Sequence, residues 1–214
     1  MKGEDTLKVM LLNGSPHEKG CTYTALSEVA AQLEKNGIES EILHVNKGEI
    51  RGCTACGACR KLGRCAYGDE DGVNDCVEKI KDADALIIGS PVHYASAAGA
   101  FSAFLDRVFY SKGTAFEGKL GAAVVSCRRG GASAAFDQLN KYFTISSMPV
   151  VSSKYWNSVH GNKPEEVLQD LEGMQTMRQL ADNMAWLLKC IEAGRAAGIN
   201  LPEREKAART NFIR

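Results

Sequence analysis

The sequence predicts an α/β fold in which a parallel sheet of five strands is covered by helices on both faces. Apolar runs that resemble buried strands alternate along the chain with helical patterns, and this alternation is typical of a parallel sheet. The first apolar run, residues 7–12, passes through a Gly/Ser loop directly into a helical pattern. Ligands of doubly wound sheets bind beyond the carboxyl ends of the strands. The loops that follow the strands are therefore the candidate functional segments.

The first half of the chain is predicted to form three strands, at residues 7–12, 39–45 and 85–88, and three helices, at residues 22–36, 73–81 and 98–110. Asn36-Gly37 ends the first helix, because glycine readily adopts the left-handed conformation that follows a helix. Residues 39–45 alternate polar and apolar side chains, as a half-buried strand does. In the third helix, apolar side chains recur every three or four positions and predict a buried stripe of Phe101, Phe104, Leu105 and Val108.

The second half is predicted to form strands at residues 120–125 and 148–151 and helices at residues 132–145 and 164–193. The sequence contains neither an internal repeat nor a second apolar core, so we expect one domain over residues 1–193. The polar tail, residues 194–214, is too long to be a frayed helix end. We expect this tail at a subunit interface.

Opposite charges balance in the composition, and this excludes some classes of partner. The 214 residues include 26 Lys and Arg and 26 Asp and Glu, so the net charge indicates neither nucleic acid nor a membrane surface. No apolar run approaches the ~20 residues of a membrane-spanning helix. Residues 1–5 are polar and lack the apolar core of a signal peptide. We therefore expect a cytoplasmic protein.

The loop after the first strand has the composition of a phosphate-binding loop. It runs from Asn13 to Thr22 into a helix start, where unpaired backbone N–H groups and the positive end of the helix dipole converge. Ser15 and Thr22 add hydroxyl groups, and Lys19 adds a charge. The loop matches neither the G-x-G-x-x-G spacing of dinucleotide sites nor the Walker A spacing. It therefore suits a phosphate monoester such as that of FMN, and the alternative is an ordinary turn capped by Thr22.

The loops after the third and fourth strands carry side chains suited to a flat ring system. In residues 89–99, Pro91 makes the turn rigid, and His93 and Tyr94 present polar-tipped rings. In residues 126–133, adjacent glycines permit a close approach of the backbone, and two arginines are suited to a carbonyl or a phosphate. The alternatives are a histidine hydrogen-bonded within its own loop and a solvated arginine pair.

Four of the eight cysteines cluster in residues 46–70, an insertion far longer than the usual ~2–6 residues between a strand and a helix. These four are Cys53, Cys56, Cys59 and Cys65. Thiolates at such short spacings are typical ligands of iron–sulfur clusters. A structural zinc site, a redox-active CxxC pair and a loop without metal are the alternatives. The isolated cysteines are expected as small core residues: Cys76, Cys127 and Cys190.

Three motifs together resemble the NADPH-dependent FMN reductase branch of the flavodoxin-like superfamily. They are N-G-S-P-x-x-x-G-x-T from Asn13, G-S-P-V-H-Y from Gly89 and A-F-x-x-F-L-D-R from Ala100. The resemblance covers about residues 7–190. It implies the strand order 2-1-3-4-5, non-covalently bound FMN and assembly into homodimers or homotetramers.

By position, the resemblance implies one group of residues around the phosphate of FMN and a second group around its ring. The phosphate group is Ser15, His17, Gly20, Cys21, Thr22 and Tyr23. The ring group is Pro91, Val92, His93, Tyr94, Ser126 and Gly130. Relatives commonly carry asparagine where this chain has Cys21, a change that preserves a backbone contact with the phosphate.

The cysteine insertion resembles the compact motif of iron–sulfur flavoproteins, a subgroup of the same superfamily. In that subgroup a [4Fe-4S] cluster lies beside the FMN, which implies ligands at Cys53, Cys56, Cys59 and Cys65. Some flavin reductases that resemble this chain keep similar cysteines without an evident cluster. The loop without metal therefore remains an alternative.

These observations predict an FMN-dependent oxidoreductase that takes electrons from NADH or NADPH. The expected partner is a small-molecule acceptor such as a quinone, a nitro compound, a metal ion or dioxygen. Because the chemistry belongs to the cofactor, no catalytic acid or base is assigned, and His93 and His160 are only candidate proton donors. Tyr155 and Trp156 are a candidate lid over the flavin, with packing under the last helix as the alternative.

The competing function is an electron carrier that shuttles electrons between protein partners. Such carriers are typically strongly acidic, whereas this chain has a net charge of zero. The acidic run Asp69-Glu70-Asp71 is the candidate docking patch for a protein partner.

Overall fold

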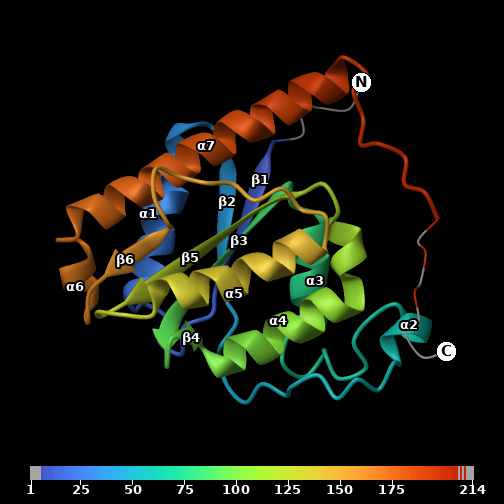
Figure 1. The fold of residues 1–214 in the computed structure, drawn as a ribbon, viewed down its shortest axis with the longest axis horizontal. Coiled ribbons are helices and arrows are strands. Elements are labelled where there is room, and N and C mark those ends of the chain that lie inside the picture. The colour runs from blue at the N-terminus through green and yellow to red at the C-terminus, as the bar shows by residue number, and fades with distance from the viewer. Residues whose placement is uncertain (1–5, 207, 209, 211–214) are drawn as a thin grey trace.

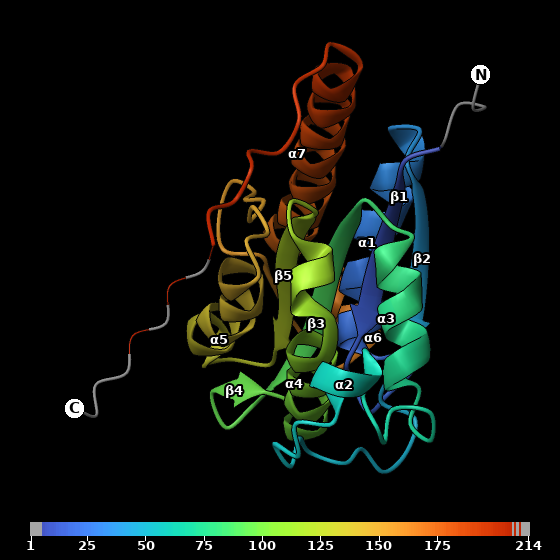
Figure 2. The ribbon, with the colours of Figure 1, turned by 90° about the vertical axis from the view of Figure 1, so that its right-hand side faces the viewer.

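The computed structural model describes residues 6–206, 208 and 210 and confirms the predicted α/β architecture. A parallel sheet lies at the centre with helices against both faces (Figures 1 and 2). Five parallel strands follow the order β2-β1-β3-β5-β6. They are β1 (Lys8–Asn13), β2 (Glu39–His44), β3 (Ala85–His93), β5 (Leu120–Cys127) and β6 (Ser158–His160). This is the predicted order, and it reverses between β1 and β3.

Two layers of helices bury the two faces of the sheet. One layer contains α1 (Cys21–Lys35) and α7 (Leu171–Ala196), and the other contains α3 (Val73–Lys81), α4 (Gly99–Lys112) and α5 (Ala132–Ile145). Side chains of β1 alternate between the layers: Val9 and Leu11 pack with α1 and α7, and Met10 and Leu12 pack with the opposite layer. None of the helices in the described residues is long and apolar enough to cross a membrane.

The predicted apolar stripe of α4 is confirmed, because all four of its side chains are buried: Phe101, Phe104, Leu105 and Val108. Phe101 also reaches the loop that follows β1. A Cβ atom on Gly14 would lie 2.1 Å from the Phe101 ring. Packing therefore requires a glycine at this position of the first motif.

The third strand is longer than predicted and includes part of the candidate site. It continues through Pro91 to His93 and turns back to pair with β4 (Ser96–Ala97) in an antiparallel hairpin. Tyr94 and Ala95 form the turn, with φ angles of 51° and 58°. Positive φ angles at both central residues match the twist of a two-residue hairpin. The segment predicted as a loop is therefore a short rigid ribbon.

The predicted strand at residues 148–151 is wrong. Only one bridge forms there, between Gly121 and Val150, and Pro149 has no N–H group with which to extend the ladder. The fifth parallel strand is β6, which pairs with the end of β5. Its three residues are too few to leave a periodic signal in the sequence.

The predicted helix over residues 164–193 is two helices. The chain forms α6 (Pro164–Val167), breaks, and begins α7 at Leu171. Asp170 causes the restart, because its carboxylate accepts a hydrogen bond of 2.9 Å from the N–H of Gly173 and so caps α7. The Asp170 carboxylate accepts the hydrogen bond that a backbone carbonyl would accept from Gly173 in a continuous helix.

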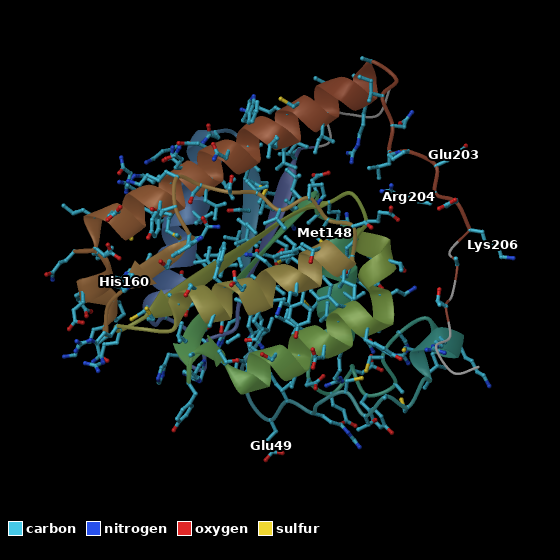
Figure 3. All side chains as sticks on the ribbon, viewed as in Figure 1. Glu49, Met148, His160, Glu203, Arg204 and Lys206 are labelled. Atoms are coloured by element: carbon cyan, nitrogen blue, oxygen red, sulfur yellow. The ribbon has the colours of Figure 1, made fainter. Side chains whose placement is uncertain are left out.

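The tail begins after Ala196, and its described part runs along its own chain. The side chain of Leu201 lies against Gly118, and Arg204 Nε lies 2.5 Å from Glu117 Oε1. Figure 3 labels Arg204 on this segment. Residues 207, 209 and 211–214 lie outside the described residues, as do residues 1–5 of the predicted domain. The expected position of the tail at a subunit interface stays a prediction.

The cysteine insertion follows β2 and contains one short helix, α2 (Cys59–Leu62). Figure 1 shows α2 near one end of α4 and β4 near the other end. Of the cysteines predicted in the core, Cys76 and Cys127 are buried, but Cys190 is exposed. Cys190 lies in the last two turns of α7 and faces away from the core, whereas the next residue, Ile191, still packs against it.

Buried Cys76 makes the free energy of unfolding depend on pH in the alkaline range. Burial raises the pKa of its thiol from 9.0 to about 12, so the folded protein keeps a proton that the unfolded chain releases. The stability that the neutral thiol contributes is therefore present below pH 9.0 and is lost as the pH rises toward 12. Above pH 9.0, the unfolding free energy of the wild type should therefore fall with pH more steeply than that of Cys76→Ala. The two slopes should differ by up to about 1.4 kcal/mol per pH unit. Urea unfolding between about pH 8 and 10.5 measures both slopes, and equal slopes would contradict the prediction.

Candidate functional site

A cleft of about 720 Å³ opens at the carboxyl ends of the strands. The loop after β1 and the carboxyl ends of β3 and β5 form three of its walls, and the segment between β6 and α6 forms the fourth. Nine of the predicted cofactor residues line it: Ser15, His17, Gly20, Cys21, Thr22, Pro91, Val92, His93 and Ser126. The sheet topology thus brings together segments that lie as far apart in the sequence as Ser15 and Pro164.

Three other predicted residues do not line this cleft. Tyr23 lies in the first turn of α1, and Gly130 is exposed after β5. Tyr94 is fully exposed at the tip of the β3–β4 hairpin. The hairpin explains this position, because alternate residues of a strand face opposite ways and the turn projects beyond the sheet.

The amino end of α1 opens onto the cleft without a side-chain cap. Gly20 is the capping residue, and no side chain accepts a hydrogen bond from the first turn. Such a helix end attracts an anion through its N–H groups and its dipole. Basic side chains also line the cleft: His17, Lys19, Arg128 and Lys163. The cleft therefore fits a phosphate group.

Thr22 does not cap α1, in contrast to the alternative interpretation of the sequence. Its hydroxyl is fully buried and lies 2.8 Å from the hydroxyl of Ser126. This hydrogen bond joins the first turn of α1 to the end of β5. It therefore fixes the distance between the start of α1 and the end of β5 across the cleft.

Three polar side chains that the sequence reasoning missed hold the phosphate loop in place. Asn13 accepts a hydrogen bond of 3.1 Å from the N–H of Ser15 and donates one of 2.8 Å to the carbonyl of Glu18. His44 Nε2 lies 2.8 Å from the carbonyl of Ser15, and Asn46 donates to the carbonyl of Gly14. His44 and Asn46 come at the end of β2 and just after it. The rule that parallel strands end at one edge could have found them.

Tyr155, Trp156 and His160 lie outside the strand-end cleft. They line a separate pocket of about 230 Å³ beside the amino end of α7. The two aromatic rings pack on each other with centroids 5.1 Å apart, and His160 Nδ1 lies 3.4 Å from Asp170 Oδ2. Figure 3 shows His160 at the β6 end of the molecule. Of the two candidate proton donors, only His93 lines the cleft.

All four clustered cysteines line one small cavity beside α4. Every one is a free thiol, with Cys53 and Cys56 exposed and Cys59 and Cys65 half-buried. Within the described residues, no three His, Cys, Asp or Glu side chains stand together as a ready set of metal ligands. The cavity therefore gathers the four thiols without closing them around a centre.

The cysteine cavity is separate from the strand-end cleft. The two share no lining residue, and α2 and β4 lie toward opposite ends of α4 in Figure 1. The resemblance implied a cluster beside the FMN. Within one chain, the four cysteines and the phosphate loop instead occupy different parts of the fold.

The fold and the cleft define a flavodoxin-like α/β protein with an open cleft at the strand ends. The profile of the NADPH-dependent FMN reductase family matches residues 7–163. The chain belongs to this family, in its iron–sulfur flavoprotein branch.

Two relatives in this branch are archaeal. An iron–sulfur flavoprotein of Methanocaldococcus jannaschii is 29% identical, over 87% of this chain and 100% of the relative. One of Archaeoglobus fulgidus is 30% identical, over 81% of this chain and 86% of the relative.

Solved structures with the same fold include flavoproteins of several activities. RosB, solved with a bound riboflavin-phosphate intermediate, superposes with a TM-score of 0.68 at 18% identity and covers 98% of this chain and 93% of its own. An NADH:FMN oxidoreductase superposes with a TM-score of 0.63 at 18% identity, over 85% and 90%. At this level of identity the similarity establishes the fold alone.

Proposed function

We propose that the strand-end cleft binds FMN and that the protein is an NAD(P)H-dependent FMN oxidoreductase. The observation that carries this proposal is the meeting of the uncapped amino end of α1 with four basic side chains in one cleft. Membership of the NADPH-dependent FMN reductase family supports it. The cleft volume of about 720 Å³ lies within the usual range of cofactor pockets.

The residues of the cleft divide into a phosphate side and a ring side. Amides of the first turn of α1 bind the phosphate, and Asn13 and His44 keep the loop in the shape that presents them. The rigid β3 segment through Pro91 and Val92 forms the wall for the ring. When bound, FMN supplies hydride and single-electron chemistry. The protein's part is to bind and orient it.

Electron donation by NADH or NADPH and transfer to a small-molecule acceptor complete the proposal. The competing electron carrier would need a surface that docks a protein partner. Its candidate acidic patch is largely neutralised, because Asp69 pairs with Arg64 and Asp71 pairs with Arg107. The reductase is therefore favoured, and we propose that it works as a homodimer or homotetramer.

We further propose that Cys53, Cys56, Cys59 and Cys65 hold a [4Fe-4S] cluster. Two features of the cavity fit this group: four free thiols line it, and a buried arginine lies beside them. Four thiolates are the usual ligands of such a cluster. Zinc, a redox-active thiol pair and a loop without metal are the outcomes that would replace it.

An absorption spectrum of protein purified without oxygen, with iron and sulfide assays, tests both cofactors. A two-banded flavin spectrum over a broad shoulder, with about four iron atoms per chain, is expected. A flavin spectrum without iron would remove the cluster and keep the flavin proposal. Colourless protein that FMN does not reconstitute would contradict the central proposal. Rapid mixing with NADPH then separates the two functions, because only the reductase loses its flavin absorbance quickly.

His17→Ala is expected to raise the Kd for FMN by roughly tenfold or more, because a hydrogen bond to a charged group contributes about 1.5–3 kcal/mol. Quenching of FMN fluorescence measures the Kd. His160→Ala is the matched control, since His160 is also an exposed histidine but lies in a separate pocket. Equal Kd values for His17→Ala and the wild type would remove His17 from the phosphate site.

A further inference from the structure

Cys65 differs from the other clustered cysteines because the folded core holds its backbone. Asn74, near the start of α3, is 9% exposed. Its side chain accepts a hydrogen bond of 3.0 Å from the N–H of Cys65 and donates one of 2.9 Å to the carbonyl of Cys65. Cys53 and Cys56 are exposed on the insertion. Cys65 is therefore the thiol whose backbone the folded core anchors.

Arg107 of α4 holds the side chain of the same cysteine. This arginine is 2% exposed and lines the cysteine cavity. Its Nε–H donates to Cys65 Sγ at 3.4 Å, and its Nη1 donates to the carbonyl of Arg51 at 3.1 Å and to the carboxylate of Asp71. Its Nη2 is buried without a hydrogen-bond partner in the described part of the chain. One N–H donor to sulfur is in place, and a second nitrogen is unused.

The ion pair with Asp71 does not by itself account for the contact of Arg107 with Cys65 Sγ. A buried ion pair often contributes little net stability, because desolvation offsets the attraction between the charges. A spare buried N–H group is a further cost unless it meets an acceptor. A cation that donates an N–H group to a thiol sulfur is, in contrast, the arrangement that stabilises negative charge on sulfur.

We propose that Arg107 is a positioning residue of the four-cysteine site and raises the reduction potential of the cluster held there. The inference rests on the proposed cluster. Reduction adds one electron, supplied by the flavin or by an added reductant, and no bond forms or breaks. Hydrogen bonds to sulfur and a nearby cation stabilise the more negative, reduced state. Asn74 and Asp71 act through Arg107 and Cys65 by fixing their positions.

The test measures the midpoint potential of the cluster. Electron paramagnetic resonance monitors the reduced cluster during a redox titration of the anaerobic holoprotein. Arg107→Lys keeps a cation but loses the planar group that reaches three partners. A second variant, Arg107→Gln with Asp71→Asn, removes both charges, so that no unpaired carboxylate remains to unfold the protein. Arg64→Gln is the matched control, because Arg64 also pairs with an acid on the insertion but is 57% exposed.

We expect all variants to keep about four iron atoms per chain and the Kd for FMN. The ratio of reduced to oxidised cluster at a fixed potential should fall about tenfold in both Arg107 variants, a shift of about 59 mV for one electron. Arg64→Gln should leave it unchanged. Equal potentials in the wild type and both Arg107 variants would overturn the proposal.

Two further results would also overturn it. Loss of iron from the Arg107 variants, with FMN binding and melting temperature retained, would make Arg107 a residue of cluster assembly instead. Wild-type protein that holds FMN but no iron after anaerobic reconstitution would remove the cluster and this inference together. The iron assay of the wild type distinguishes failure of the proposed cluster from failure of the role of Arg107.

Discussion

Asp71→Ala is expected to lower the free energy of unfolding by about 3–5 kcal/mol, because it leaves a buried guanidinium without its counter-ion. The side chains of Arg107 and Asp71 are only 2% and 11% exposed. The pair also joins the cysteine insertion to α4, since Arg107 donates to the carbonyl of Arg51 as well. Urea or thermal unfolding of the purified protein measures the loss.

The control for this change is an exposed ion pair of the adjoining helix. Glu78→Ala breaks a pair with Lys81 in which Glu78 is 64% exposed, and such pairs contribute less than about 1 kcal/mol. Replacing both partners, as Arg107→Met with Asp71→Leu, should recover much of the stability, because neither charge then remains buried. If Asp71→Ala unfolded at the same urea concentration as the wild type, the pair would not be buried in solution.

Gly14→Ala is expected to cost about 3 kcal/mol of stability and to weaken FMN binding, because overpacking a filled core forces side chains and backbone apart. The added Cβ would lie 2.1–2.4 Å from three atoms of the Phe101 ring. Phe101 is fully buried and cannot move aside, so the loop that carries Ser15 has to shift. Unfolding curves and quenching of FMN fluorescence measure the two effects.

Gly48→Ala is the matched control, because no atom lies within 4 Å of the Cβ position at Gly48. It should change neither stability nor the Kd for FMN appreciably. Gly14→Ala combined with Phe101→Leu should recover part of the loss, since the smaller side chain leaves room. If the stability losses of Gly14→Ala and Phe101→Leu simply added in the double variant, the Phe101 ring would not be the obstacle.

Strong local signals made much of the fold predictable. The stripe of Phe101, Phe104, Leu105 and Val108 is buried as its spacing predicts, and α3 and α5 begin and end where the pattern places them. The loop after β1 was predictable because it lies between a strand pattern and a helix pattern, which have different periodicities. Nine of the predicted cofactor residues, from this loop and from the ends of β3 and β5, line one cleft.

Elements without a local signal were missed. The three residues of β6 are defined by their pairing with β5, and the break before α7 depends on the cap formed by Asp170. The β3–β4 pairing, which places Tyr94 at an exposed turn, also left no local signal, and the contact of Tyr94 with the ring stays a prediction. Arg107 was part of a motif, yet nothing in its sequence neighbourhood indicated that it would donate to Cys65, 42 residues away.

The sequence by itself determined four of the five parallel strands (β1, β2, β3 and β5), the helices α1, α3, α4 and α5, and the grouping of four cysteines, because periodicity and spacing are local properties of the chain. Only the tertiary structure decided that the cysteine cavity is separate from the strand-end cleft and that Asn13, His44 and Asn46 hold the phosphate loop. It also decided that Arg107 and Asn74 fix Cys65. These contacts join residues on different elements, and their positions follow from how the sheet and helices pack in three dimensions.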